Sequence, residues 1–285
     1  SRGLGDVYKR QGLCFRTRHR ATLRNGRLWH TVNHHPLIIS AAMSFQSRLL
    51  SDIPGIRYAF LDVHETAAFP YSEMAPVKLV HGNVVHHFQQ PAPLTDRPHA
   101  DAVFTASSGQ KVGVVTADCL PMLMASRDGR FVCSVHAGWR GAATGIIANS
   151  LDLFARHGIP PDEVVVAIGP HIQVCCYEVS AAFYQALLAT PVAGLVKQHR
   201  DRLFLHRRGP EPAAEKARAT GDDTMWFDLR AFGQLLLRRA GVPESHIEWL
   251  GSCTYCTPQS LGSFRRRTHF PAEKTFQYSW IMREA

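Results

Sequence analysis

The amino-acid sequence predicts an α+β fold in which mixed β-sheets are flanked by helices within one compact domain. Short apolar runs of strand length alternate with amphipathic segments of helix length, and glycine or proline separates them. Because 45% of the 285 residues are hydrophobic, the chain can bury a substantial core. The pattern leaves open a division of this domain into two related α/β subdomains.

The most regular part of the pattern begins at Lys111. Apolar runs at Lys111–Thr116 and at residues 131–135 predict two short buried strands, with a turn signal at residues 127–129 between them. Further along, apolar residues at helical spacing over residues 147–154 predict a helix that ends at Gly158.

Two later passages resemble each other in their order of helix, glycine, proline and strand. They occupy residues 156–168 and 239–250, and they contain the predicted strands Val164–Ile168 and 247–250. Asp228 is expected to cap the helix of the second passage. The similarity is too short to establish a duplication. Between the passages, residues 197–224 are charged and interrupted by glycine and proline, which predicts an exposed excursion.

The positive charge is concentrated near the beginning of the sequence. Residues 1–42 contain eight lysines and arginines and a single acid, and they supply most of the formal net charge of +9. We therefore expect residues 1–42 to be a basic leader outside the core, disordered or not native, and residues 43–285 to form the domain. The small remaining charge argues against nucleic acid as a partner. Apolar runs of only strand length argue against a membrane span.

Cysteine usage indicates a reducing compartment. The chain has seven cysteines, an odd number, and no recognisable secretory signal, so we expect reduced thiols and a cytoplasmic location. Cys175 and Cys176 are adjacent, and Cys253 and Cys256 form a lone CxxC. A CxxC without a second pair is a weak zinc or redox signal, and structural thiols are the preferred interpretation.

Three segments place a histidine or cysteine beside a backbone turn. They contain His81, Cys119 and His136 in residues 79–82, 116–121 and 136–141. Taken singly, these residues fit ordinary roles as a surface histidine, a buried thiol and a strand-end histidine. The three segments become specific only when they are considered together.

Taken together with other segments, they resemble the laccase-domain family of purine nucleoside phosphorylases over roughly residues 45–283. The segments that support this resemblance are LVHGNVV, TADCLPML, HAGWRG, IGPHIQVCCYEV, and CTYC followed by SFRRR. The resemblance implies a metal site formed by His81, Cys119 and His136. It also implies phosphorolysis of adenosine, inosine, guanosine and S-methyl-5′-thioadenosine, together with adenosine deamination. The expected partners are therefore a purine nucleoside and phosphate.

The residue types in this triad favour zinc. One thiolate and two neutral imidazoles suit Zn²⁺, and three protein ligands leave a fourth position open, as in catalytic zinc sites. Copper is the alternative metal, and it would accompany a polyphenol oxidase activity. A single Cys-His-His set is not the array of many histidines expected for several coupled copper ions, so this alternative is disfavoured.

Five further residues are candidates for catalysis or substrate binding. Arg140 lies at an expected helix start and suits phosphate, although it could instead stack on its neighbour Trp139. Asp118 could orient a ligand histidine or accept a proton, although a strand-end aspartate also caps its own turn. The sequence thus predicts Asp118 and Arg140 as catalytic residues, and as substrate-binding residues Arg140, His171, Tyr177 and Arg265.

Two other functions remain open at this stage. One is a Cys-His hydrolase acting on peptidoglycan precursors, with Cys119 as nucleophile. The other is a non-catalytic, metal-stabilised nucleoside-binding protein. This second alternative is motivated by a departure from the family pattern, since the chain lacks a Gly-Gly-Val-Ser-like passage between Ala59-Phe60 and His81. The sequence does not indicate the oligomeric state.

Overall fold

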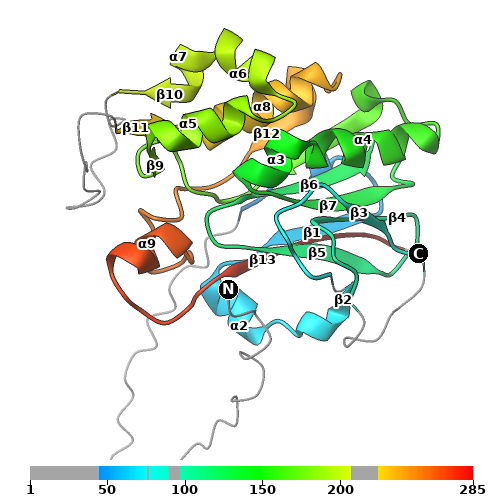
Figure 1. Cartoon of the computed structure of the whole chain (residues 1–285). Helices are drawn as coiled ribbons and strands as arrows, with labels where there is room; N and C mark the ends of the chain where they lie inside the picture. Colours follow the sequence, from blue (N-terminus) through cyan, green and yellow to red (C-terminus); the bar gives the residue numbers. More distant parts are fainter. Residues whose placement is uncertain (1–44, 76, 90–96, 207–223, 285) are drawn as a thin grey trace, which may run out of the picture. The chain divides into compact units, whose positions relative to one another are not determined.

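The computed structural model describes residues 45–75, 77–89, 97–206 and 224–284 (Figure 1). The predicted leader, residues 1–42, lies outside these ranges, as does most of the predicted excursion. Within the described ranges the chain forms helices and three β-sheets, and the predicted α+β class is confirmed. No helix in these ranges is both long enough and apolar enough to span a bilayer.

The central element is a six-stranded mixed sheet. Its middle strands β8, β6 and β7 pair in antiparallel fashion, whereas β12 joins β8 and β3 joins β4 in parallel. The strand order is β12-β8-β6-β7-β4-β3. The bounds are β3 Val85–His87, β4 Ala102–Thr105, β6 Leu120–Ser126, β7 Val132–Ala137, β8 Val164–Ile168 and β12 Ile247–Trp249.

Two smaller sheets complete the β-structure. In the four-stranded sheet the order is β1-β13-β5-β2, and β13 pairs in antiparallel fashion with β1 and β5. Its strands are β1 Ile56–Phe60, β2 Met74–Ala75, β5 Lys111–Thr116 and β13 Gln277–Arg283. The three-stranded sheet, in the order β10-β11-β9, consists of β9 Glu178–Val179, β10 Phe204–Leu205 and β11 Met225–Phe227.

Helices cover the face of the six-stranded sheet opposite the four-stranded sheet. Figure 1 shows α3, α4 and α8 above the first sheet and strands β1, β5 and β13 below it. The helices of the described residues, including those that lie elsewhere, are α1 Arg48–Ser51, α2 Val63–Ala68, α3 Trp139–Thr144, α4 Ile146–Arg156, α5 Ala181–Leu188, α6 Ala193–Gln198, α7 Arg200–Leu203, α8 Leu229–Arg239 and α9 Phe264–His269.

The core consists of two layers, one on each face of the six-stranded sheet. Along β6, Met122 and Met124 belong to the layer beneath the helices, whereas Leu123 and Ala125 belong to the layer between the two sheets. Successive side chains of a strand point to opposite faces, so a strand buried on both faces has no polar alternation. This burial explains the continuous apolar runs in the sequence.

Several predicted elements are confirmed, whereas strands such as β1, β4, β6 and β13 were not predicted. Strands at Lys111–Thr116 and Val164–Ile168 have the predicted bounds, and the side chain of Asp228 caps α8 by accepting the Ala231 N–H at 2.8 Å. Among the strands that were not predicted, β6 lies inside the six-stranded sheet and contains Pro121. Proline cannot donate to a ladder and argues against a central strand. Here the Pro121 carbonyl still accepts the Gly169 N–H at 3.0 Å, so pairing with β8 continues.

The two similar passages lie side by side, strand against strand and helix against helix. Their strands β8 and β12 pair in parallel, and the helices that precede them, α4 and α8, contact each other. A glycine with left-handed backbone follows each helix, Gly158 at φ 79° and Gly241 at φ 99°. Because the two strands are parallel neighbours, they end at the same edge of the sheet, and the loops that follow them meet there.

We propose that the domain starts close to residue 43, so that a chain lacking residues 1–42 folds normally. The described structure is already integrated at its first residues, because Phe45 is buried and the Ser47 hydroxyl donates to Glu248 Oε2 at 2.6 Å. We expect the shortened chain to unfold at nearly the same temperature as the full chain in calorimetry. A loss of several degrees would show that the leader belongs to the domain.

Candidate metal centre

His81, Cys119 and His136 lie together at one edge of the six-stranded sheet. Cys119 immediately precedes β6, and His136 lies near the end of β7, where it is opposite Pro121 in the β6–β7 hairpin. His81 comes from the loop before β3, which enters the sheet in parallel with β4. The sheet topology therefore brings together three side chains that are separated in sequence.

The ligand atoms of the three side chains lie within 4.8 Å of one another. The two imidazole rings are 4.9 Å apart between centroids and nearly perpendicular, at 82°. His136 is buried, Cys119 is half-buried and His81 is exposed, so the group extends from the core to the surface. This arrangement could hold one metal ion and leave a coordination position open toward the exposed side.

Asp101 connects two of the three residues. Its fully buried carboxylate accepts Nδ1–H of His136 at 2.8 Å through Oδ1, and the same oxygen accepts the backbone N–H of His81 at 2.9 Å. The other oxygen accepts the N–H groups of Val80 at 3.2 Å and Gly82 at 2.7 Å. With Nδ1 engaged in this way, Nε2 is the ring atom of His136 that faces Cys119. A carboxylate bound to the outer nitrogen of a ligand histidine is the usual support for a metal site.

The backbone is strained at two residues of this site. Among the described residues other than glycine, His81 at φ 59° and Asp118 at φ 97° have left-handed backbone. Such conformations cost of order 1–3 kcal/mol each and persist where surrounding contacts enforce them. At His81 the contacts are the three N–H groups held by Asp101. The fold thus uses stabilising interactions to aim the His81 side chain at its partners.

The local charges favour a thiolate at Cys119. Burial raises the pKa of this thiol, but the positive charges of His136 and His81 and their hydrogen bonds outweigh burial and lower the pKa to about 7. Burial lowers the pKa of His136, but the Cys119 thiolate and the Asp101 carboxylate outweigh that effect and raise the pKa to about 10. At neutral pH a substantial fraction of Cys119 is therefore the thiolate, which is the form that binds metals.

Glycines allow the close approach of the loops around the triad. A Cβ atom at Gly138 would lie 3.0 Å from Cys119 Sγ and 3.3 Å from His81 Cδ2, and one at Gly141 would lie 2.6 Å from the Gly82 carbonyl oxygen. Real Cβ atoms do not make contacts as short as 2.6 Å. The HAGWRG segment therefore needs Gly141 to pack against the His81 loop, and any side chain at Gly138 would crowd two of the ligands.

Asp118 contacts different partners from those of Asp101. Its carboxylate accepts the Thr254 hydroxyl and the backbone N–H of Arg265, each at 2.6 Å, and thereby connects the turn before β6 to the loop after β12 and to the start of α9. Burial raises the pKa of this carboxyl above its ordinary range, although the two hydrogen bonds act in the opposite direction. The carboxylate bound to a triad histidine is that of Asp101, and the predicted catalytic role of Asp118 stays a prediction.

Tyr177 lies close to Cys119 of the triad and to three other residues predicted for the site, Asp118, Arg140 and Arg265. The pKa of its phenol is raised by burial first and by the negative charges of Cys119 and Asp118, whereas the positive charges of Arg265 and Arg140 lower it. The Arg265 guanidinium lies over the Tyr177 ring at 5.4 Å from the centroid, and it donates to the Glu178 carbonyl oxygen at 2.7 Å. The fold thus gathers two cationic side chains and one aromatic ring beside the triad.

Arg140 and His171 have contrasting surroundings. Arg140 is exposed, is the second residue of α3, and stacks over the Trp139 ring at 4.5 Å from the centroid. His171 is 2% exposed and donates from Nδ1 to the Gly169 carbonyl oxygen at 2.9 Å, and burial lowers its pKa to about 4. Arg140 is accessible to a ligand from solvent, whereas His171 supports the loop after β8. The predicted substrate contacts of both residues stay predictions.

Comparison with known proteins gives consistent results. The family described as multi-copper polyphenol oxidoreductase laccase matches residues 56–272. A protein of Rickettsia conorii named purine nucleoside phosphorylase is 29% identical over 72% of this chain and 75% of its own length. A Synechocystis protein with the same name is 28% identical over 89% and 96%. A protein from an unknown prokaryote named adenosine deaminase RL5 is 32% identical over 58% and 56%.

Solved structures support the same fold. The crystal structure of YlmD from Geobacillus stearothermophilus superposes with a TM-score of 0.62 at 24% identity, over 86% of this chain and all of that protein. The region that matches the family, residues 56–272, contains the segments of all three triad residues and extends over three quarters of the sequence. The chain therefore belongs to the multi-copper polyphenol oxidoreductase laccase family, whose relatives compared above are named purine nucleoside phosphorylases and, in one case, an adenosine deaminase.

Proposed function

We propose that the chain is a zinc-dependent purine nucleoside phosphorylase with adenosine deaminase activity. The observation that supports this proposal most directly is the convergence of one cysteine and two histidine ligand atoms within 4.8 Å at an exposed edge of the sheet. The names of the relatives provide the reaction class. The proposed substrates are adenosine, inosine, guanosine and S-methyl-5′-thioadenosine, with phosphate as the second substrate.

The triad residues fit zinc better than they fit a group of copper ions. A thiolate with two imidazoles is a common zinc donor set, and the buried Asp101 carboxylate fixes the tautomer of His136 as zinc sites require. When bound, zinc supplies a Lewis acid at the open position. The protein's own contribution is to hold Cys119 as a thiolate and to hold His81 in a strained turn.

The cationic residues beside the triad suit the phosphate. Arg140 is exposed on α3, and Arg265 lies over Tyr177, so two guanidinium groups surround the region in which a nucleoside and phosphate would meet. Guanidinium groups bind phosphate oxygens through charge-assisted hydrogen bonds. The Tyr177 ring offers an aromatic surface for the purine. We propose these three residues as the substrate contacts, with His171 supporting them from the adjoining loop.

Asp118 is the proposed proton-exchanging group. Burial raises the pKa of its carboxyl, which is the change needed for a carboxyl group to carry a proton near neutral pH. The left-handed backbone at this residue supports a functional interpretation, because such strain is concentrated at active sites. In this proposal Asp118 exchanges a proton with the purine leaving group.

The decisive experiment combines metal analysis with a chromatographic assay. The purified full chain should contain zinc, should release hypoxanthine from inosine only when phosphate is present, and should release ammonia from adenosine without phosphate. Nucleoside binding without turnover would instead support the non-catalytic alternative. Turnover that is indifferent to zinc removal would contradict the proposed role of the triad.

Replacing Arg140 by alanine tests the phosphate contact. We expect phosphorolysis to weaken by about one to two decades, because a charge-assisted contact is worth roughly 1.5 to 3 kcal/mol. The loss should appear mainly in the dependence of the rate on phosphate concentration. Deamination, which needs water rather than phosphate, should fall much less, and zinc content should be unchanged.

Arg156→Ala is the matched control for this substitution. Arg156 is also an exposed helical arginine, but it lies in the last turn of α4, at the opposite end of that helix from α3. Its loss should leave both reactions unchanged. If Arg140→Ala reduces both reactions equally, the residue acts structurally through its stacking on Trp139, and the phosphate assignment is wrong.

A further inference from the structure

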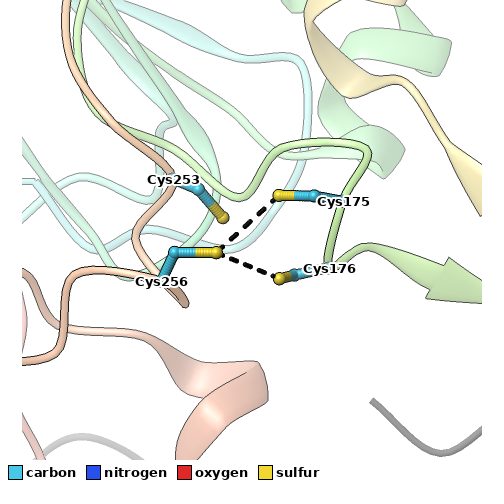
Figure 2. Close-up of side chains that lie close together, drawn as sticks. All are labelled: Cys175, Cys176, Cys253 and Cys256. Carbon is cyan, nitrogen blue, oxygen red and sulfur yellow. Dashed lines mark hydrogen bonds between the residues drawn. The ribbon is translucent and has the colours of Figure 1, made fainter. Parts of the chain in front are cut away.

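Four cysteine side chains form a second cluster. Their sulfur atoms all lie within 4.8 Å of one another, and the cluster is distinct from the group formed by His81, Cys119 and His136. Figure 2 shows the four thiols pointing toward a common centre from two loops. The residues are Cys175 and Cys176 from the loop after β8, and Cys253 and Cys256 from the loop after β12.

The spacing of the sulfur atoms is that of ligands around a single ion. With metal–sulfur bonds of about 2.3 Å, the sulfurs of a tetrahedral tetrathiolate site are ~3.8 Å apart. Sγ of Cys256 lies 3.8 Å from Sγ of Cys175 and 3.3 Å from Sγ of Cys176. A disulfide bond would require about 2.05 Å. A cluster of several irons would need more space between its cysteines than 4.8 Å allows.

Main-chain pairing brings the two pairs of cysteines together. Because β8 and β12 are adjacent and parallel, the loops that follow them leave the sheet at the same edge. The loops are joined by backbone pairing between His171 and Cys253, which includes a bond of 3.1 Å from the Thr254 N–H to the His171 carbonyl oxygen. The adjacent pair and the CxxC are therefore held facing each other by main-chain contacts.

The backbone also provides a contact typical of a sulfur that bears negative charge. The N–H of Gln173 points at Sγ of Cys253 at 3.4 Å. Cys175, Cys176 and Cys253 are buried and Cys256 is half-buried, so the cluster is largely shielded from solvent. Four soft sulfur ligands without an open position are typical of a structural zinc site.

We propose that Cys175, Cys176, Cys253 and Cys256 bind one structural Zn²⁺, additional to the ion of the candidate metal centre. The ion would fasten together the loops that follow β8 and β12. Tyr177 and Glu178 come directly after one cysteine pair, and Thr254, which donates to Asp118, lies between the cysteines of the other. The proposed zinc therefore holds in place the two loops that carry Tyr177 and Thr254 beside the candidate metal centre.

Zinc stoichiometry measured on variants of the full chain tests this proposal. Protein purified from zinc-supplemented medium without chelators should contain about two equivalents of zinc per chain, one for each site. Both His81→Ala and Cys256→Ser should contain about one equivalent, and His81→Ala combined with Cys256→Ser should contain none. Cys133→Ala is the matched control, because Cys133 is a buried cysteine outside both clusters, and it should keep the wild-type zinc content.

His81→Ala keeps the test valid even if Cys256→Ser fails to fold, because it leaves all four cysteines in place. Loaded with cobalt, this variant should show the intense thiolate-to-cobalt charge-transfer absorption of a tetrathiolate site. A folded His81→Ala protein without zinc or this absorption would overturn the proposal, as would a wild-type mass two hydrogens short, which indicates a disulfide. Failure of the proposed enzymatic function would give a different result. The wild-type chain would then lack turnover, but Cys256→Ser would still contain one equivalent of zinc less than the wild type.

Discussion

Replacing Cys119 by serine should remove metal from the candidate centre and reduce both phosphorolysis and deamination by about three orders of magnitude, the value of several kcal/mol of Lewis-acid stabilisation. The Cys119 thiol has a pKa of about 7, and it lies against two imidazoles. A serine hydroxyl is nearly isosteric but stays protonated at neutral pH, so the site loses its anionic ligand. Zinc content and the release of hypoxanthine and ammonia should be measured on the same preparation.

The matched control for this prediction is Cys133→Ala. Cys133 lies on β7 three residues before His136 and is fully buried, but it belongs to the core beneath the helices. Its loss should cost some stability and leave zinc content and turnover intact. Turnover that persists in Cys119→Ser after complete zinc loss would exclude a metal-dependent reaction. Zinc retained together with the loss of turnover would instead favour Cys119 as a nucleophile.

Replacing Asp101 by asparagine should weaken zinc binding by about 10–100-fold, which is the usual effect of removing an outer support of a ligand histidine. An asparagine side chain has one accepting oxygen in place of two, and its NH₂ group would face backbone N–H groups. The N–H donors of residues 80–82 and Nδ1–H of His136 would then lack sufficient acceptors in a fully buried place. Thermal unfolding should reveal a loss of roughly 1–3 kcal/mol for each group left unsatisfied.

Asp128→Asn is the control for Asp101→Asn. Asp128 also accepts a backbone N–H within a turn, from Arg130 at 3.1 Å, but its side chain is exposed and lies at the far end of the β6–β7 hairpin. Zinc affinity, measured by competition with a chromophoric chelator, should be unchanged in this variant. Equal affinities in Asp101→Asn and the wild-type protein would show that the carboxylate does not support the ligands.

Much of the fold could be predicted because the strands are buried on both faces. Strands β5 and β8 follow from their apolar runs, and α8 follows from its helical spacing and from Asp228 as its cap. Strand β6 was missed because it begins with Leu120 and Pro121 directly after Cys119, a pattern that indicates a turn. Its position is determined by pairing with β7 and β8, which lie later in the sequence.

The surroundings of the site were harder to predict than its three central residues. The bonds of Asp101 to residues 80–82 and to His136 depend on how β3 and β7 lie against β4, and no local spacing reveals this. The same holds for the four cysteines. The lone CxxC gains its second pair only because β8 and β12 are parallel neighbours. Long-range strand pairing, rather than any property of these residues alone, forms both clusters.

The position of Cys119 and His136 at the open ends of one hairpin has a consequence for the denatured chain. Only 16 residues separate these two ligands along the chain, so unfolded molecules keep them at a high effective concentration and can still chelate metal. Metal binding to the unfolded state reduces the stabilisation that a metal confers on the native state. His81, by contrast, reaches the pair only after β3 has joined β4. The coupling between metal binding and folding at this centre therefore depends chiefly on His81.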